Sequence, residues 1–147
     1  MTLRILSTAD WHLSNSGVVA GRYVLRDGMN LCLWDKIQSV KIICDYVAEN
    51  DIDLVVIAGD LFDKPNPENV AIKVAVEAIE RLSEFAPVMI VKGNHDGGKG
   101  GELANALSVF GSRRRKHGIY VSDRPEIIPI LSKQRKIQVF TLPYPRK

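Results

Sequence analysis

The sequence predicts an α/β protein built on a parallel β-sheet, and three observations support that fold class. Short apolar runs rich in branched residues alternate with longer segments of helical periodicity. The apolar runs are almost unbroken, which is typical of parallel strands covered on both faces. The chain has 147 residues, of which 46% are hydrophobic and 25% charged. That size and composition fit one globular domain over residues 1–147 with a core of its own.

Five elements are expected first, in the order strand, helix, strand, helix, strand. The strands are predicted at residues 3–7, 53–58 and 87–91, where the apolar runs lie. Apolar residues at steps of three and four predict the first helix over residues 33–49. Asn66 as N-cap and Pro67 at the first helical position predict the start of the second helix. Crossovers of this kind are right-handed and build a parallel sheet.

The rest of the chain is less regular. Residues 13–30 contain three glycines without a clear period, so we expect either a functional loop or elements that the pattern hides. A weaker helix is predicted over residues 102–109. The runs GIYV, EIIPI and KIQVF near the C-terminus predict added strands, either antiparallel in the same sheet or the start of a second sheet.

Polar side chains follow each of the three predicted parallel strands, where the strand ends. The three stretches are TADWH, AGDLFD and KGNHD. Because the carboxyl ends of parallel strands share one edge of a sheet, these residues should become neighbours in space. The residues gathered in this way are Asp10, His12, Asp60, Asp63, Asn94, His95 and Asp96.

The residue types at this edge predict a metal centre. Crowded carboxylates repel one another unless a cation compensates them. Carboxylate, imidazole and amide ligands without a thiolate suit Mn²⁺, Fe²⁺ or Zn²⁺. Two such ions sharing one carboxylate clamp a phosphoryl group, and Asp60 on the second strand is the natural bridging residue. Each motif by itself is equally compatible with a helix cap or a tight turn, so the prediction rests on their coincidence at successive strand ends.

Taken together, the motifs D-x-H, G-D-x-x-D and G-N-H-D resemble those of the calcineurin-like metallophosphoesterase superfamily. Within it, STADWHL, AGDLFDKPNP and TLPYPR resemble stretches of the SbcD-type DNA exonucleases. The resemblance implies a β-sandwich flanked by helices, with a parallel βαβαβ first half, of which this chain holds only part. It also implies hydrolysis of phosphodiester bonds in DNA repair with two divalent ions, usually Mn²⁺.

The same resemblance implies roles for individual residues. The metal ligands would be Asp10, His12, Asp60 and Asn94, with Asp60 shared by both ions. His95 would contact the scissile phosphate, and Asp96 would orient the His95 ring. Asp63 belongs to the motif but is expected to lie outside the set of ligands.

One departure from the family pattern concerns the histidines. Family members carry a further histidine and then a G-H-x-H motif downstream, whereas this chain has three histidines and no His-x-His. The chain therefore supplies the first half of a two-metal site. We expect that it is truncated at its C-terminus, that another chain completes the site, or that the second metal is weak or absent.

A basic run and the family resemblance suggest partners. Arg113, Arg114, Arg115 and Lys116 could contact DNA phosphates, although a solvated surface turn explains them equally well. The net charge of +3 permits a polyanionic partner without demanding one. The resemblance implies a coiled-coil ATPase partner of the SbcC type, and a homodimer stays open.

The chain shows no membrane signal and no secretion signal. No apolar run reaches the roughly 20 residues of a membrane span, and the two cysteines form no disulfide framework. We therefore expect a cytoplasmic protein. Two other functions stay open: a phosphatase or phosphodiesterase acting on small nucleotides, and a non-catalytic DNA-binding or assembly module that lacks the later histidine ligands.

Overall fold

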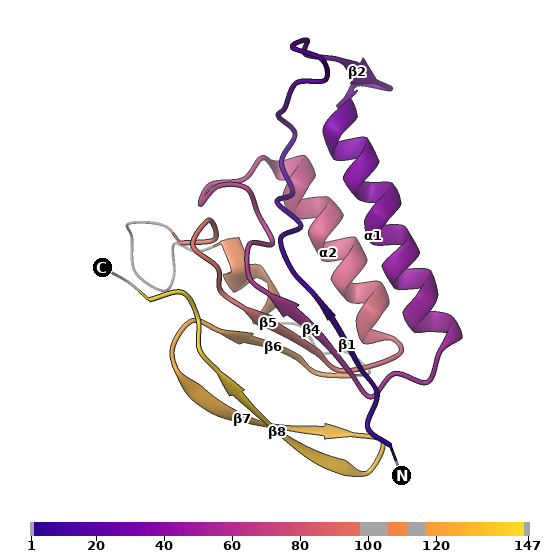
Figure 1. Cartoon of the computed structure of the whole chain (residues 1–147), viewed down its shortest axis with the longest axis vertical. Coiled ribbons are helices and arrows are strands. Elements are labelled where there is room, and N and C mark those ends of the chain that lie inside the picture. The colour runs from indigo at the N-terminus through magenta and orange to yellow at the C-terminus, as the bar shows by residue number, and fades with distance from the viewer. Residues whose placement is uncertain (1, 98–105, 112–116, 146–147) are drawn as a thin grey trace.

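The computed structural model describes residues 2–97, 106–111 and 117–145, which form a layered α/β structure (Figure 1). The middle layer is a parallel sheet of order β1-β4-β5-β6. Its strands are β1 (Ile5–Thr8), β4 (Leu54–Ala58), β5 (Val88–Val91) and β6 (Ile119–Ser122). The outer layers are helices α1 (Leu31–Glu49) and α2 (Asn69–Ser83) on one face and the antiparallel hairpin of β7 (Glu126–Ser132) and β8 (Arg135–Thr141) on the other. The predicted α/β class and its parallel first half are confirmed.

The central strands are apolar on both faces because each face packs against a different layer. Val55 and Ile57 of β4 belong to the core beneath the two helices. Leu54 of the same strand packs with Met89 and Ile130 in a second, smaller core beneath the hairpin. Each large apolar side chain that is fully buried in this way stabilises the fold by about 1.5–3 kcal/mol. The unbroken apolar runs of β4 and β5 therefore reflect a sheet between two layers.

Strand β1 departs from that expectation. It pairs only with β4, at the edge of the sheet. Leu6 packs against the helix-side core, whereas Ile5 on the opposite face stays 49% exposed. The hairpin covers the central strands but leaves this face of β1 open, so an apolar run did not ensure burial on both faces.

Helix α1 begins two residues before its predicted start, whereas α2 begins two residues after its predicted start. Asn30 caps α1, since its side chain accepts a hydrogen bond from the Cys32 N–H at 2.9 Å. Helix α2 begins only at Asn69, so the predicted start at Asn66 and Pro67 is wrong. The physical reason is that other contacts of Glu68 keep the residues before Asn69 out of the helix. The Glu68 carboxylate accepts hydrogen bonds from Lys64 Nζ at 2.6 Å and from the Asn15 N–H at 3.2 Å.

The region 13–30 contains short elements that the sequence pattern hid. Strands β2 (Leu25–Arg26) and β3 (Met29–Asn30) form a small antiparallel hairpin. Asp27 and Gly28 connect them with φ of 51° and 78°, as a type I′ turn requires. Ala20 and Gly21, with φ of 50° and 74°, form another tight turn. Figure 1 shows this region at the end of α1, away from the sheet.

The C-terminal third adds one parallel strand and one hairpin. β6 joins the first sheet in parallel with β5, and β7 and β8 start a second sheet, as one of the two expectations had it. The helix predicted over residues 102–109 lies partly outside the described residues, and its described end is the 3₁₀ helix η2 (Ala106–Phe110). Within the described residues, none of the helices has the length and apolarity that crossing a bilayer requires.

Candidate metal centre

The three polar turns meet at the carboxyl edge of the parallel sheet. Past β1 and β4 the backbone continues side by side: Asp10 N donates to Gly59 O at 3.1 Å, and His12 N donates to Asp60 O at 2.9 Å. The third turn joins them, since His95 N donates to Asp60 Oδ1 at 2.8 Å. The structure therefore brings the acidic and imidazole residues of all three motifs to one edge.

The backbone is strained at three of the four proposed ligands. Asp10, His12 and Asp60 have φ of 55°, 44° and 52°, in the left-handed region that residues other than glycine rarely occupy. Such strain persists only where the surroundings hold the chain firmly, and it gathers at functional sites. Trp11, between two of these residues, is buried in the core and donates to Thr8 Oγ1 at 3.0 Å. The fold thus holds these side chains in a geometry that the local sequence disfavours.

Two glycines let the second and third turns approach each other. Gly59 has a φ of 101°, and a Cβ built on it would lie 3.2 Å from Gly93 Cα. A Cβ on Gly93 would lie 2.1 Å from Asp60 Oδ1 and 2.3 Å from Asp60 N. No side chain fits in that space, so Gly93 is required for the contact between Asp60 and the turn that carries His95.

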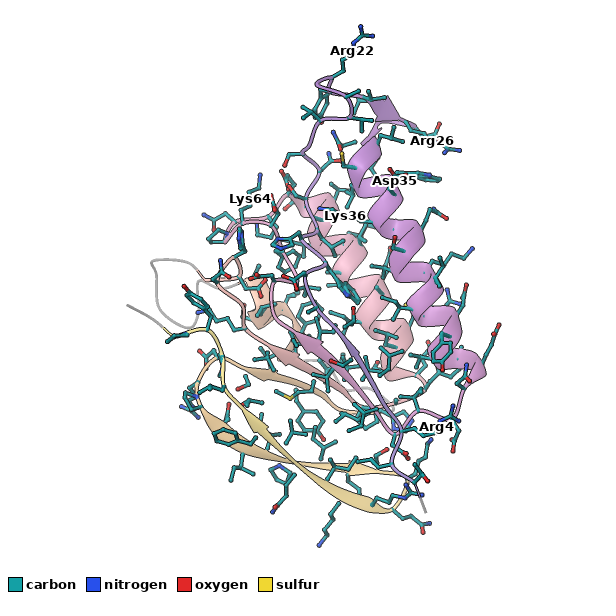
Figure 2. The ribbon with its side chains drawn as sticks, viewed as in Figure 1. Arg4, Arg22, Arg26, Asp35, Lys36 and Lys64 are labelled. Carbon is teal, nitrogen blue, oxygen red and sulfur yellow. The ribbon has the colours of Figure 1, made fainter. Side chains whose placement is uncertain are left out.

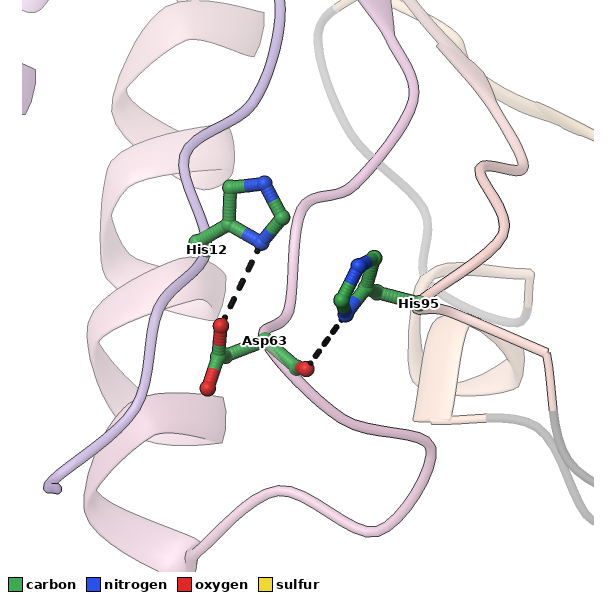
Figure 3. A group of neighbouring side chains, drawn as sticks. All are labelled: His12, Asp63 and His95. Carbon is green, nitrogen blue, oxygen red and sulfur yellow. Dashed lines mark hydrogen bonds and ion pairs between the residues drawn. The ribbon is translucent and has the colours of Figure 1, made fainter.

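Two overlapping groups of potential ligands share His12. One consists of Asp10, His12 and Asp60, and the other of His12, Asp63 and His95. In each group the ligand atoms lie within 4.8 Å of one another. Nε2 of His12 is 3.5 Å from Asp10 Oδ1, and its Nδ1 is 3.4 Å from Asp63 Oδ1 (Figure 3). One imidazole therefore lies between two carboxylates.

His95 faces the same cluster from the opposite side. Its ring packs edge-on against His12, with centroids 4.8 Å apart and an interplanar angle of 86°. Nδ1 of His95 lies 2.8 Å from the Asp63 carbonyl oxygen (Figure 3). That carbonyl is the main reason why the pKa of His95 lies above its usual value. Burial lowers this pKa by less than the carbonyl raises it, and the negative charges of Asp60, Asp63 and Asp96 raise it further.

Asp63 was expected at this edge, but its contacts with both imidazoles were not. Its carboxylate lies beside His12 and its carbonyl beside His95, so it contacts both rings. It had been expected to lie outside the set of ligands, yet the structure places it in one of the two potential ligand groups. Its position three residues after Asp60 already placed it at this edge, but no pattern in the sequence shows that its carboxylate and its carbonyl each reach a different imidazole.

The Asp96 carboxylate forms hydrogen bonds other than the one expected with the His95 ring. It is 1% exposed, and its carboxylate accepts hydrogen bonds from the backbone N–H groups of Leu61, Phe62 and Gly93, at 3.3, 2.9 and 3.0 Å. The expected contact that would orient the His95 ring is replaced by the Asp63 carbonyl. Asp96 points into the protein, where it joins the second and third turns through their backbones. It therefore positions the loop that carries His95.

Two further residues complete the surroundings of the centre. Asn94, the fourth proposed ligand, lies between Gly93 and His95, and the residue is exposed. Lys36 of α1 donates its Nζ to the His12 carbonyl and so connects the helix to the first turn. It lies in the N-terminal part of α1 (Figure 2).

The basic run of Arg113, Arg114, Arg115 and Lys116 lies outside the described residues.

The residues at this edge fit a divalent cation. Among the described residues, neither lysine nor arginine forms an ion pair with Asp10, Asp60 or Asp63. Nδ1 of His12 is buried and forms no hydrogen bond, although Asp63 Oδ1 lies 3.4 Å from it. Carboxylates and imidazoles without a thiolate form the donor set that Mn²⁺, Fe²⁺ and Zn²⁺ accept. A bound cation would compensate the carboxylates, which repel one another without it.

The fold and the site agree with the family to which the chain is matched. The profile of the calcineurin-like phosphoesterases matches residues 3–142, and the chain belongs to this family of metal-dependent hydrolases. It is also similar to two SbcD proteins, each named as a component of the SbcCD nuclease. The one from Bacillus subtilis (strain 168) is 31% identical over 130 residues, which are 87% of this chain and 29% of the relative. The one from Staphylococcus epidermidis (strain ATCC 12228 / FDA PCI 1200) is 32% identical over 145 residues, 97% of this chain and 34% of the relative.

These similarities confirm the predicted resemblance to the metallophosphoesterases and to SbcD-type nucleases. The family uses divalent metals, in agreement with the clustered ligands. The chain spans about a third of the length of the curated relatives it matches.

Proposed function

We propose that this chain carries the first half of the metal centre of a DNA nuclease of the SbcD type. The observation that carries the proposal is the group of potential ligands Asp10, His12 and Asp60 at the carboxyl edge of a parallel sheet, to which the turn with Asn94 and His95 is joined through Asp60 Oδ1. The substrate is inferred from the names of the relatives, both of which are components of a nuclease. A partner of the SbcC type and a cytoplasmic location belong to the same proposal.

The ligands of the first ion are Asp10, His12 and Asp60, and Asp60 together with Asn94 contributes to the second. Mn²⁺ is the ion we propose, since it accepts carboxylate, imidazole and amide ligands. Bound divalent ions supply positive charge that neutralises the phosphate and lowers the pKa of water. The strained backbone of Asp10, His12 and Asp60 holds the ligand atoms in place before an ion arrives.

His95 acts on the phosphate in this proposal. Its ring lies against His12 and is oriented by the Asp63 carbonyl. In the metal-free protein the Asp63 carbonyl raises the pKa of His95. A protonated imidazole beside a phosphodiester can donate to a non-bridging oxygen or protonate the leaving oxygen. Asp96 keeps the loop with His95 against the second turn.

Metal content separates the proposed roles. Asp60→Ala should lose metal more completely than Asn94→Ala, since a bridging carboxylate serves two ions. His95→Ala should keep the metal of the wild-type protein and lose hydrolysis. Metal per chain is measured by elemental analysis after gel filtration, and hydrolysis by Mn²⁺-dependent digestion of linear duplex DNA. Equal retention in the first two variants would contradict a bridging Asp60, and loss of metal in His95→Ala would make His95 a ligand.

A chromogenic phosphodiester tests the substrate class separately. Both relatives are named as components of a nuclease, so digestion of duplex DNA is the expected result. Turnover of the chromogenic ester without digestion of DNA would favour an enzyme for small nucleotides.

A second candidate is an assembly or DNA-binding module without turnover. In that case the residues of this chain bind at most one ion and hydrolyse no phosphodiester. Titration of the purified chain with Mn²⁺ decides between the two. Two tightly bound ions per chain would reject the non-catalytic module, whereas less than one would favour it.

A further inference from the structure

Asp63 and His95 are two side chains at the metal centre that the proposed set of ligands leaves out. Together with His12 they form a group of potential ligands of their own, whose ligand atoms lie within 4.8 Å of one another. Figure 3 shows the two rings on either side of Asp63. This group combines two imidazoles with one carboxylate, whereas the group of Asp10, His12 and Asp60 combines one imidazole with two carboxylates.

His12 Nδ1 and Asp63 Oδ1 are separated as two ligands of one ion are. The two atoms lie 3.4 Å apart, and Nδ1 is buried without a hydrogen bond. Two ligand atoms that each lie about 2.1 Å from a tetrahedral Zn²⁺ are about 3.4 Å from each other. A buried polar atom without a partner costs free energy, and a cation between this nitrogen and the carboxylate removes that cost.

The His95 ring is supported in the way that metal-bound histidines are. Its Nδ1 lies 2.8 Å from the Asp63 carbonyl oxygen. Because a carbonyl oxygen only accepts, Nδ1 carries the proton, and Nε2 of His95 keeps its lone pair. Metal-bound histidines commonly donate their other ring N–H to such a carbonyl, which fixes the direction of the ring. Asp63 therefore offers its carboxylate as one ligand and orients a second ligand through its carbonyl.

The group needs little movement to close around an ion. Its longest separation is at most 4.8 Å, so reaching the spacing of tetrahedral ligands takes a shift of about 1.4 Å, which side-chain rotation supplies. The backbone holds both turns in place: Asp63 N donates to Leu13 O at 3.3 Å, and His95 N donates to Asp60 Oδ1 at 2.8 Å. Three protein ligands leave the fourth tetrahedral position to solvent.

The two groups that share His12 suit different ions. Imidazole ligands favour Zn²⁺, whereas oxygen ligands favour Mn²⁺. A neutral imidazole has one nitrogen with a free lone pair, since the other nitrogen carries the proton. His12 faces Asp10 with Nε2 and Asp63 with Nδ1. It can therefore serve the one group or the other, but not both at the same time.

We infer that His12 Nδ1, Asp63 and His95 Nε2 form a Zn²⁺ site that excludes Mn²⁺ from the centre at Asp10 and Asp60. Zn²⁺ bound there withdraws His12 from the first ion and occupies the ring that contacts the phosphate. The zinc site itself does not depend on the proposed function; only the inhibition of hydrolysis that follows from it rests on that proposal.

A pair of carboxylate variants tests the site by its Zn²⁺ affinity, measured on the whole chain by competition with a chromogenic chelator. Asp63→Asn should weaken Zn²⁺ binding about 100-fold, because it removes a ligand. Asp10→Asn is the matched control, since it makes the same exchange on the other side of His12 and should weaken Zn²⁺ binding much less. Circular dichroism confirms that both variants fold. Equal losses in the two variants, or a larger loss in Asp10→Asn, would overturn the site.

The ring nitrogens of the wild-type protein give a readout that a folding defect cannot imitate. Nitrogen NMR of the histidine rings shows which atoms bind Zn²⁺, because the ion is diamagnetic. Zn²⁺ should shift His12 Nδ1 and His95 Nε2, and His117, outside the group, should keep its shifts. A shift at His12 Nε2 in place of Nδ1, or none at His95, would overturn the site.

Release of Mn²⁺ separates this inference from the proposed function. Electron paramagnetic resonance of free Mn²⁺ should show that Zn²⁺ displaces Mn²⁺ from the wild-type protein and, at the same concentration, leaves it bound to Asp63→Asn. Simultaneous binding of both ions to the wild-type protein would overturn the exclusion. If the wild-type protein binds Zn²⁺ through His12 Nδ1 and His95 but binds no Mn²⁺, the proposed function fails and the zinc site stands. Binding of Mn²⁺ without Zn²⁺ would have the opposite meaning.

Discussion

The two edges of the parallel sheet hold their carboxylates in opposite ways. At the amino edge, Asp53 lies 3.7 Å from Lys133 Nζ and 3.5 Å from Arg135 Nη1. At the carboxyl edge, Asp10 and Asp63 form ion pairs with His12. Among the described residues, they form ion pairs with no other side chain. Lys36 lies near that edge (Figure 2), yet its Nζ binds a backbone carbonyl. The amino edge therefore compensates its acids from within the chain, and the carboxyl edge leaves them available to a cation.

The difference extends to the backbone. Asp53 is 3% exposed and accepts the Arg4 N–H at 2.9 Å, in ordinary backbone geometry. At the carboxyl edge, Asp10, His12 and Asp60 all have positive φ. Backbone strain and carboxylates without a lysine or arginine partner thus coincide at the carboxyl edge among the described residues, and Asp53 at the amino edge shows neither. This separation is what a fold shows when one edge stabilises the protein and the opposite edge serves binding.

The largest expected effect comes from closing the gap between the second and third turns. Gly93→Ala places a Cβ against Asp60 Oδ1 and N, so the turns must separate. We expect a loss of about 3 kcal/mol in the free energy of unfolding, measured in urea, and loss of bound metal. Gly111→Ala is the control, since its Cβ would lie at an ordinary 3.5 Å from Ser108 O. Wild-type stability and metal content in Gly93→Ala would show that this close contact is not needed.

Neutralising one acid at each edge should have opposite effects on the metal-free protein. Asp53→Asn removes the charge that pairs with Lys133 and Arg135 and should lower the free energy of unfolding by about 2 kcal/mol. Asp10→Asn relieves repulsion at the metal centre and should raise it by about 0.5 kcal/mol. Both are measured by urea denaturation in chelator.

Bound metal should reverse the effect of Asp10→Asn on the free energy of unfolding. In excess Mn²⁺ the wild-type protein should gain stability through binding, and Asp10→Asn should gain less. Loss of stability in both variants under chelator would show that the acids of the carboxyl edge are compensated within the chain after all.

The smallest effect concerns pH, and the two edges should respond in opposite ranges. The Asp63 carbonyl raises the pKa of His95, so this group's contribution is complete below 6.5 and is lost as pH rises through its higher folded pKa. At the amino edge, a hydrogen bond from Lys133 lowers the pKa of Asp51; that contribution is complete above 3.8 and is lost as pH falls through its lower folded pKa.

NMR titration of the metal-free protein measures both groups. Lys133→Met should return Asp51 toward its ordinary pKa and leave His95 unchanged, because Lys133 and His95 lie at opposite edges of the sheet. A His95 pKa at or below 6.5 in the metal-free protein would contradict the orientation of its ring against Asp63.

The sequence by itself determined the class of fold and the edge of the sheet at which the candidate ligands lie. Unbroken apolar runs placed β4 and β5, periodicity placed most of α1, and the polar residues that follow each strand marked the edge at which these side chains gather. These patterns are local: they report which backbone conformation and which burial a short segment prefers. The meeting of the three motifs followed from one general property of parallel sheets, that their strands end at the same edge.

Only the tertiary structure decided which atoms meet at that edge. Asp96 accepts backbone N–H groups 34 and 35 residues away, Asp63 contacts both imidazoles, and Glu68, directly before the late start of α2, accepts the Asn15 N–H from 53 residues away. The open face of β1 likewise depends on how far the hairpin reaches. Contacts of this kind arise when two segments pack in one register, and the preference of neither segment alone contains that register.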